Sequence, residues 1–335
     1  MELIPMLYSV CGVSQKIAAI RAAESSLGIQ VSDQVEHARG LLVFAETARE
    51  LSLRLFSDWL TDVSNIKVKI IKWFTDVSHT YSWALCIDPQ QSGQIDLEEC
   101  AKDLESILSV LAIKTITDGK RMSAFLEEGS AGLTSEVRGL FASEIDLLSG
   151  EPHAGIDFTD ASTQAAISAA LKTDEAYRFC AQPDLNDQCY ENSLYTLICN
   201  DNSLNKKDYC CNLNDLSFRF FVLMNALCSI PKCIRVEPQR SLIKTSQKGT
   251  GIVKAARGAL LHQLQLEDQP TSECIVKDYK IVAPTEWNFH PRGTLVKMLE
   301  GAKVGKEQLL VLVESLIKLI DPCVKWQLKL EIDHA

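Results

Sequence analysis

The chain of 335 residues contains 12 cysteines but no C-x-x-C pair. Zinc ribbons and ferredoxin-type iron–sulfur clusters are built on such pairs, so the spacing argues against both kinds of metal site. The sequence also lacks the G-x-x-x-x-G-K-[ST] pattern of a phosphate-binding P-loop. No uncharged apolar run reaches the length of a transmembrane helix.

Positive charge is in short supply, because 34 Lys and Arg face 44 Asp and Glu, for a formal net charge of −10. A protein this acidic is a poor candidate for binding nucleic acid or an anionic membrane. The apolar stretch over 3–13 has Glu2 before it and Pro5 within it, so we expect no export signal and a cytoplasmic protein. In that compartment many cysteines favour reduced thiols, a metal, or both.

Apolar residues at helical spacing predict a long helix that starts with a capping-box-like pair, Asp33 and Glu36, and runs to Trp59. Further helices are predicted over 66–85, 97–112, 134–148, 160–172, 216–229 (stopped by Pro231), 294–299 and 307–320. Residues 173–212 hold five cysteines with little periodicity. We interpret them as a loop-rich region with scattered reduced thiols; a zinc site there is the less favoured alternative.

Two runs with strand character, 254–262 and 279–284, flank a polar turn at 267–272 and predict a β-hairpin. Arg257 precedes a glycine, and Thr285 follows a proline, so each run meets a break beside a strong hydrogen-bond donor. A guanidinium, a hydroxyl and free backbone amides at strand ends can form a polar clamp for a small anionic group.

Three motifs occur in a fixed order: A-R-G-x-L-x-H at 256–262, Y-x-I-V-x-P-T-x-W-N-x-x-P at 279–291, and D-P-C at 321–323. Together they are far more specific than any one alone. In this order they resemble the C-terminal half of the large subunit of nickel–iron hydrogenases. Shorter, large-subunit-like accessory proteins of the HupK/HoxV type, which assist hydrogenase assembly, are the better match.

The resemblance and the helical pattern together imply a single α+β, mostly helical domain over 1–335. We expect a hydrogenase large-subunit-like helical bundle over 1–172 and a Cys-rich loop and helix insert over 173–250. A small mixed β region and C-terminal helices should follow over 251–335.

The N-terminal segment adds a candidate ligand. An ungapped match to the family pattern C-G-x-C-x-x-S-H places Cys11 on the second cysteine, Tyr8 on the first and Gln15 on the histidine. A gapped alternative places Cys11 on the first cysteine and Ser14 on the second. In the family the second cysteine bridges the two metals, so the ungapped match implies that Cys11 touches iron. The alternative role for this side chain is that of a small buried hydrophobe.

The other matches are partial. Asp321 and the proline after it predict an N-cap and the first turn of a helix, which would place the Cys323 thiol at a helix N-terminus. The family pattern continues D-P-C-x-x-C-x-x-H, but Trp326 and Lys329 stand at the last two positions. Lys254 replaces a glutamate near the family's proton path.

A further, weak match lies over 183–194, where Glu191 takes an acidic position and Asn192 and Ser193 replace a Thr-Gly pair.

The resemblance implies a site that binds an Fe(CN)2(CO) unit, with two metal ligands and four residues around the cyanides: Cys11 and Cys323, then Arg257, Thr285, Ala256 and Pro284. Soft thiolates suit such low-spin iron. Two thiolates cannot supply the usual nickel sphere, so we expect no nickel and no enzyme activity. Both thiols should meet beside the β region.

The predicted function is therefore a maturation scaffold that receives, holds or passes on the iron unit. Its implied partners are a small cysteine-bearing maturation chaperone and the precursor of a nickel–iron hydrogenase large subunit. A second hypothesis is a metal-free, degenerate large-subunit relative that acts as a docking module. A third, an active hydrogenase subunit, is disfavoured by Tyr8, Trp326 and Lys329.

Overall fold

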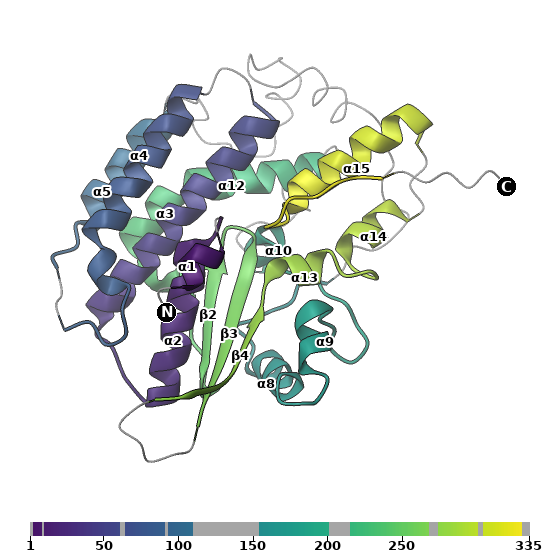
Figure 1. The fold of residues 1–335 in the computed structure, drawn as a ribbon. Coiled ribbons are helices and arrows are strands. Elements are labelled where there is room, and N and C mark those ends of the chain that lie inside the picture. The colour runs from purple at the N-terminus through teal and green to yellow at the C-terminus, as the bar shows by residue number, and fades with distance from the viewer. Residues whose placement is uncertain are drawn as a thin grey trace.

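The structure, a computed structural model, describes residues 3–8, 10–60, 64–90, 93–109, 154–200, 215–267, 274–300 and 304–329. The helix predicted over 134–148, the hairpin turn after Glu267, and Cys210 and Cys211 lie outside these ranges. The described elements are mostly helices arranged around one small sheet (Figure 1). The predicted α+β class is thereby confirmed.

A group of helices forms one side of the molecule, with the long helix α3 (Asp33–Asp58) at its centre. Ser32 caps α3, because its side chain accepts a hydrogen bond from the Val35 N–H; the cap therefore lies one residue before the predicted pair. Around α3 pack α4 (Ser64–Thr80), the short 3-10 turn Ser82–Ala84 and α12 (Asp215–Val236), and α5 (Leu97–Ser109) packs against α4 and α12. Their apolar stripes meet in the larger hydrophobic core.

Helix α12 does not stop where proline was expected to end it. It runs through Pro231 to Val236. A proline inside a helix removes one backbone hydrogen bond and costs about 3 kcal/mol. Ile230 and Ile234, on either side of it, are buried in the larger core. Burial of this apolar face offsets the cost, and the prediction of a stop at Pro231 was wrong.

The sheet has four strands in the order β1-β2-β3-β4: Leu242–Ile243, Thr250–Ala255, Gly258–Leu266 and Val276–Val282. Neighbouring strands are antiparallel in every described pair, so the sheet is not the mixed one that we expected. Strands β3 and β4 form the predicted hairpin, with Leu261 opposite Val282. The tight β2–β3 turn places Arg257 at one end of the sheet.

One face of the sheet is covered by α2 (Gly12–Leu27). The two backbones approach closely at Gly251 in β2, where an added Cβ would lie 2.1 Å from the carbonyl oxygen of Ala18. Only glycine fits such an approach. Because α2 packs closely against the sheet, its N-cap residue, Cys11, lies next to the β2–β3 turn.

The opposite face of the sheet packs on α8 (Ala161–Ala170), α9 (Ala176–Ala181) and α13 (Pro284–Asn288). Side chains alternate between the two faces as the strand pleat requires, so Ile252 joins this second core while Val253 joins the larger one. Trp287 lies at the centre of the second core, with its ring edge-on to Phe158 and Phe179. This packing fixes α13, which carries Thr285.

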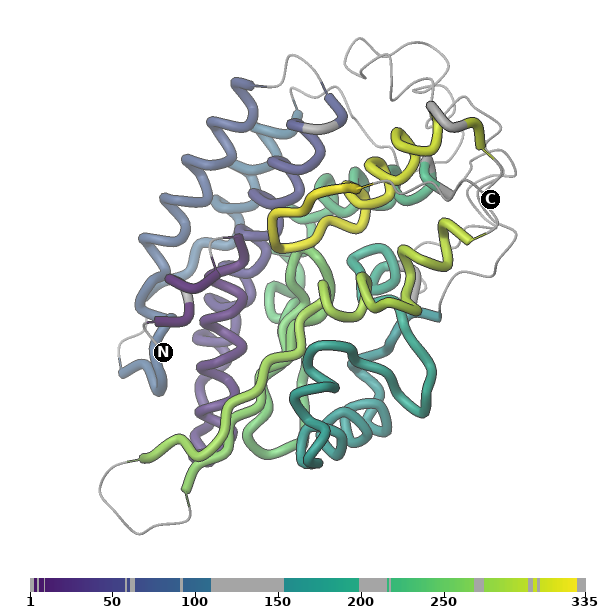
Figure 2. The backbone as a smooth tube through the Cα atoms, turned by 45° about the vertical axis from the view of Figure 1, so that its right-hand side comes forward, coloured from purple at the N-terminus to yellow at the C-terminus, as the bar shows by residue number. Residues whose placement is uncertain are grey.

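The C-terminal part returns to the N-terminal segment. After α14 (Thr294–Leu299) and α15 (Lys306–Ile320), the chain turns back and runs past the start of α2 (Figure 2). The short helix α1 (Ile4–Leu7) lies on the same side. The remaining described helices are α10 (Leu194–Asn200) and a 3-10 turn at Pro238–Ser241. Among the described helices, none combines the length and the apolar character that crossing a membrane requires.

Candidate functional site

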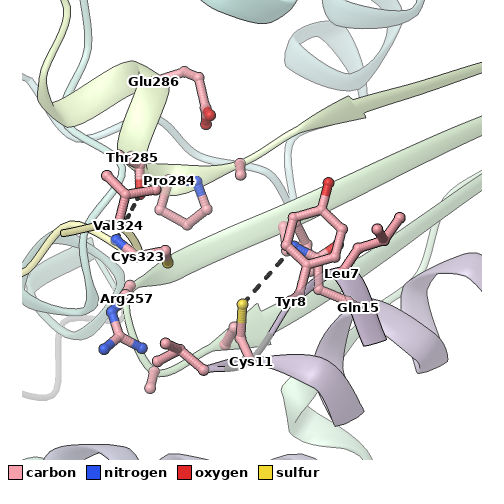
Figure 3. Close-up of a pocket in the computed structure, with 15 residues that line it drawn as sticks. Leu7, Tyr8, Cys11, Gln15, Arg257, Pro284, Thr285, Glu286, Cys323 and Val324 are labelled. Atoms are coloured by element: carbon pink, nitrogen blue, oxygen red, sulfur yellow. Dashed lines mark hydrogen bonds between the residues drawn. The ribbon is translucent and has the colours of Figure 1, made fainter. Parts of the chain in front are cut away.

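A cavity of about 190 Å³ lies where the start of α2, the β2–β3 turn, α13 and the segment after α15 meet (Figure 3). All six residues predicted for the site line it: Cys11, Ala256, Arg257, Pro284, Thr285 and Cys323. Pockets for drug-sized ligands measure about 300–1,000 Å³. This cavity therefore suits a small group of few atoms rather than a nucleotide or a peptide.

The two cysteines come from opposite ends of the chain and face each other inside this cavity (Figure 3). Cys11 is 7% exposed, and Cys323 is partly buried. A hydrogen bond between the two sulfurs is the largest influence on the pKa of each thiol. The expectation that both ends of the chain meet beside the sheet therefore holds.

This hydrogen bond makes the two thiols unequal. It raises the pKa of Cys11, and burial together with the negative charge on Cys323 raises it further. The pKa of Cys323 is instead lowered to about 7, first by the hydrogen bond from Cys11 and then by the charge of Arg257 and a hydrogen bond from Thr285, although burial acts against it. The first proton of the pair is therefore lost around pH 7, and the species that forms keeps its remaining proton on Cys11 and its thiolate on Cys323.

Arg257 is buried to 92% beside this pair, and its orientation is fixed by two carboxylates. Nη1 donates to Glu50 at 3.2 Å, and Nη2 pairs with Asp321 at 2.8 Å. Burial acts against its charge, but Asp321, Cys323 and Glu50 outweigh burial and raise the pKa of Arg257. The Nε–H has no hydrogen-bond partner within the described ranges. The guanidinium thus has one buried N–H that is able to donate a hydrogen bond to a bound group.

No helix starts at Asp321, contrary to our prediction. Asp321 instead ends α15 in a left-handed conformation (φ 59°), and its N–H bonds the carbonyl of Ile317 at 2.7 Å. Its carboxylate cannot cap a following helix because it is engaged by Arg257 and lies 3.8 Å from Arg54. The thiolate of Cys323 is therefore favoured by its side-chain neighbours rather than by a helix N-terminus.

Thr285 connects α13 to the C-terminal segment. Its Oγ1 accepts a hydrogen bond from the Cys323 N–H at 3.2 Å, and its hydroxyl donates to the Cys323 sulfur. Pro284 occupies the first turn of α13, where its missing N–H costs nothing. These contacts place a hydroxyl donor, a thiolate and an apolar ring on one wall of the cavity.

The β2–β3 turn is held from behind by Asn192. Gly258 adopts φ +141°, and an added Cβ there would lie 2.3 Å from the carbonyl oxygen of Asn192. The Asn192 side chain also bonds both backbone groups of Ala259, and its own backbone bonds Asn288 of α13. Residues that we matched weakly to a family motif thus fix the relative position of Arg257 and α13.

Glu191, the acidic residue of that weak match, is not among the residues that line the cavity. It forms a two-pronged ion pair with Arg219 of α12, at 2.5 and 2.7 Å. Both side chains are almost fully buried. Glu191 therefore anchors the loop to the helical bundle and is a structural residue.

Several cavity residues were missed from the sequence. Glu286 lines the cavity with a buried carboxyl oxygen that has no hydrogen-bond partner in the described part of the chain. Burial raises its pKa. Tyr8 and Gln15 also line the cavity, although we treated them only as replacements for family ligands. Glu50 could have been suspected, because Glu46, Glu50 and Arg54 repeat at four-residue spacing on a helix face that is otherwise buried.

The donor set suits a small iron unit with diatomic ligands. Two sulfurs offer soft ligands for low-spin iron. The Nε–H of Arg257, which has no partner among the described residues, can donate to a cyanide nitrogen, which is a good acceptor. The Thr285 hydroxyl can do the same if it turns away from the Cys323 sulfur. Among the described residues, no group of three or more His, Cys, Asp and Glu comes together in a way that could hold a metal ion. Any metal in this cavity would depend on ligands that it brings with it.

Comparisons with known proteins place the sequence among hydrogenase-related proteins. The sequence model for nickel-dependent hydrogenases matches residues 225–325, which include Arg257, Thr285 and Cys323. The chain is 26% identical, over 99% of its length and 87% of the relative, to the hydrogenase expression/formation protein HupV of Azotobacter chroococcum. It is 25% identical to the hydrogenase expression/formation protein HupK of Azotobacter vinelandii, again over 99% of this chain and 87% of the relative.

Among solved structures, the fold matches that of the reduced, active Ni-Fe-Se hydrogenase from Desulfomicrobium baculatum. The TM-score is 0.55 at 15% identity, over 96% of this chain and 88% of the other. The molecule is thus built on the fold of a nickel–iron hydrogenase large subunit. Among proteins with this fold, it resembles the hydrogenase expression/formation proteins of the HupK, HupV and HoxV type. The resemblance that we inferred from the sequence is thereby confirmed.

Proposed function

We propose that the protein is a maturation scaffold that transiently holds the Fe(CN)2(CO) unit of a nickel–iron hydrogenase and passes it on. The observation that carries the proposal is the meeting of Cys11 and Cys323 beside Arg257 and Thr285 in one small cavity. The names of the relatives, hydrogenase expression/formation proteins, support a role in assembly. The activity is non-catalytic in this proposal.

In this scheme the two sulfurs bind the iron, and Arg257 and Thr285 hold its cyanides. Binding requires both sulfurs to be deprotonated, so the protons that remain on the thiol pair must leave as the unit enters. Tyr8 stands at the cavity wall where the family has a nickel ligand, and two sulfurs are too few for the usual nickel sphere. We therefore propose that nickel is added later, to the hydrogenase itself. The partners would be a small cysteine-bearing chaperone and the large-subunit precursor.

Infrared spectroscopy tests the proposal directly. The protein, purified after co-expression with a hydrogenase maturation system, should show cyanide and carbon monoxide stretching bands and contain iron. Cys11→Ala and Cys323→Ala should each lose the bands. Cys100→Ala is the matched control, because Cys100 is also a buried thiol but lies in the larger core near Tyr81. Bands that are absent from the wild type, or that survive loss of both cavity cysteines, would refute the scaffold.

A second function, docking without metal, is favoured by apolar side chains exposed near the cavity. Leu7 and Val324 line the cavity and are 76% and 63% exposed, and Met6 beside Leu7 is 80% exposed. Such a group of exposed apolar residues is typical of a protein–protein contact. Co-purification with a hydrogenase precursor that is lost in Leu7→Ser and Val324→Ser, but unchanged in both cysteine variants, would support docking alone.

A further inference from the structure

A line of hydrogen bonds leads from the interior of the sheet to the sulfur of Cys11. Tyr279 of β4 bonds Nδ1 of His262 on β3, and Nε2 of His262 lies 2.6 Å from Oε1 of Gln15 on α2. The amide Nε2 of Gln15 then donates to the Cys11 sulfur at 3.8 Å, as Figure 3 shows. Four side chains from three elements thus form one continuous chain that ends at the cavity.

The side-chain amide of Gln15 sets the direction of this chain. His262 and Gln15 are 0% and 1% exposed. A neutral imidazole has one donor and one acceptor nitrogen. The Gln15 oxygen can only accept, so Nε2 of His262 carries the proton, and Nδ1 accepts from the Tyr279 hydroxyl. The amide nitrogen of Gln15 is then the atom that faces the sulfur. Burial lowers the pKa of His262 to about 3, which agrees with a neutral ring.

The direction continues beyond Gln15. The negative charge at the end of the line is favoured on Cys323, because its pKa is lowered first by Cys11 and further by Arg257 and Thr285. Every donor in the line therefore points toward the cavity, and the negative charge collects on Cys323. A chain of aligned hydrogen bonds polarises its members and strengthens each bond. Removal of one donor should then weaken the hydrogen bond to the Cys11 sulfur even when the substituted residue does not line the cavity.

We propose that Gln15, oriented by His262 and Tyr279, is a positioning residue that delivers an N–H donor to the Cys11 sulfur and so tunes how strongly that sulfur binds a metal. The proposal deepens the scaffold function and rests on it for the identity of the bound group. An N–H donor withdraws electron density from a sulfur ligand, and a weaker sulfur donor holds iron less tightly. That property fits a site that must give its metal unit away.

The test compares the carbon monoxide band of loaded wild type, Gln15→Met and Tyr279→Phe. Gln15→Met keeps an unbranched side chain without an N–H, so the sulfur should donate more to iron and the band should move to lower wavenumber. Tyr279→Phe removes only the hydroxyl that orients His262, and it should move the band the same way by a smaller amount. Gln263→Met is the control, because Gln263 is a buried β3 glutamine that instead bonds Ser168.

Bands at the same position in wild type and Gln15→Met would overturn the inference and leave the scaffold function standing. If the wild type carries no such bands, the scaffold function fails, and the inference is read on the metal-free protein instead. There the S–H stretching band, assigned to Cys11 by its loss in Cys11→Ala, should shift in Gln15→Met. An S–H band that Gln15→Met leaves in place would equally overturn the role of Gln15.

Discussion

The Cys323 thiol should react with alkylating reagents at a lower pH than an ordinary cysteine. Its pKa is lowered to about 7 from a usual value of 9.0, first by the hydrogen bond from Cys11 and then by Arg257. At pH 7 roughly half of the Cys323 side chains are thiolates, against about 1% for an unperturbed thiol. A thiolate of lower pKa is also a weaker nucleophile, by about eightfold for this shift. The net rate at pH 7 should therefore be about sixfold above that of an equally accessible, unperturbed thiol.

Two substitutions separate the causes. Cys11→Ala removes the strongest influence, so the midpoint of the Cys323 rate profile should move from about 7 toward 9.0. Arg257→Met should move it in the same direction by less, because the hydrogen bond from Cys11 remains. Arg257→Lys keeps a positive charge and should give a value between the wild type and Arg257→Met.

The assay is timed alkylation with iodoacetamide over a series of pH values, followed by mass spectrometry of the peptide that contains Cys323. Cys228 provides an internal reference, because burial raises its pKa to about 11 and it should stay unmodified near neutral pH. The reasoning is refuted if the wild-type midpoint lies near 9, or if Cys11→Ala leaves the midpoint where it was.

Three further outcomes follow from the same contacts. The pKa of His262 is about 3 in the folded protein and 6.5 in the free residue, so between these pH values only the unfolded chain binds the extra proton. The free energy of unfolding should therefore fall by ~1.4 kcal/mol for each pH unit below 6.5. Urea titrations at several pH values should show that the free energy of unfolding of His262→Gln depends less steeply on pH. Gly258→Ala should lower the free energy of unfolding by at least ~1–3 kcal/mol, since its Cβ meets Asn192; an unchanged melting temperature would contradict the strain. Glu50→Gln weakens the ion pair between Glu50 and Arg257, so Arg257 can interact more strongly with a bound iron unit, and more iron should remain after gel filtration of the loaded protein. Equal iron retention in the variant and the wild type would show that Glu50 does not compete with the iron unit for the guanidinium.

The cavity could be predicted from the sequence because its walls lie inside short, contiguous motifs. Arg257 and Thr285 each sit one residue from a backbone break, and that local geometry survives in the fold. The residues that orient the side chains of the cavity, Cys11 and Arg257 among them, could not be found in this way. Glu50 is 207 positions from Arg257, and Gln15 is 247 positions from His262. Such contacts depend on how α2 and α3 pack on the sheet, and no local spacing encodes that packing.

Local rules also failed where tertiary contacts outweighed them. Asp321 followed by proline is a good helix start in isolation, but the carboxylate that would cap the helix is bound by Arg257. Pro231 is a good helix stop in isolation, but Ile230 and Ile234 keep α12 against the larger core. In both cases a contact between distant segments replaced the local preference. The first of these failures lies at the site itself, where the side chain of Asp321 serves the cavity rather than its own helix.

On the scaffold proposal, the charges next to the cavity would help a bound group to leave. Arg257 in the cavity wall belongs to a connected network of three guanidiniums and three carboxylates: Arg49, Arg54, Arg257, Glu46, Glu50 and Asp321. This network is close to neutral before any metal enters. Iron(II) with two cyanides and two thiolates is a dianion, and a buried charge without a partner is costly. Arg257 is already shared between two carboxylates, so it can stabilise that dianion only in part. On the scaffold proposal, incomplete neutralisation lowers affinity and favours release to a better-matched site.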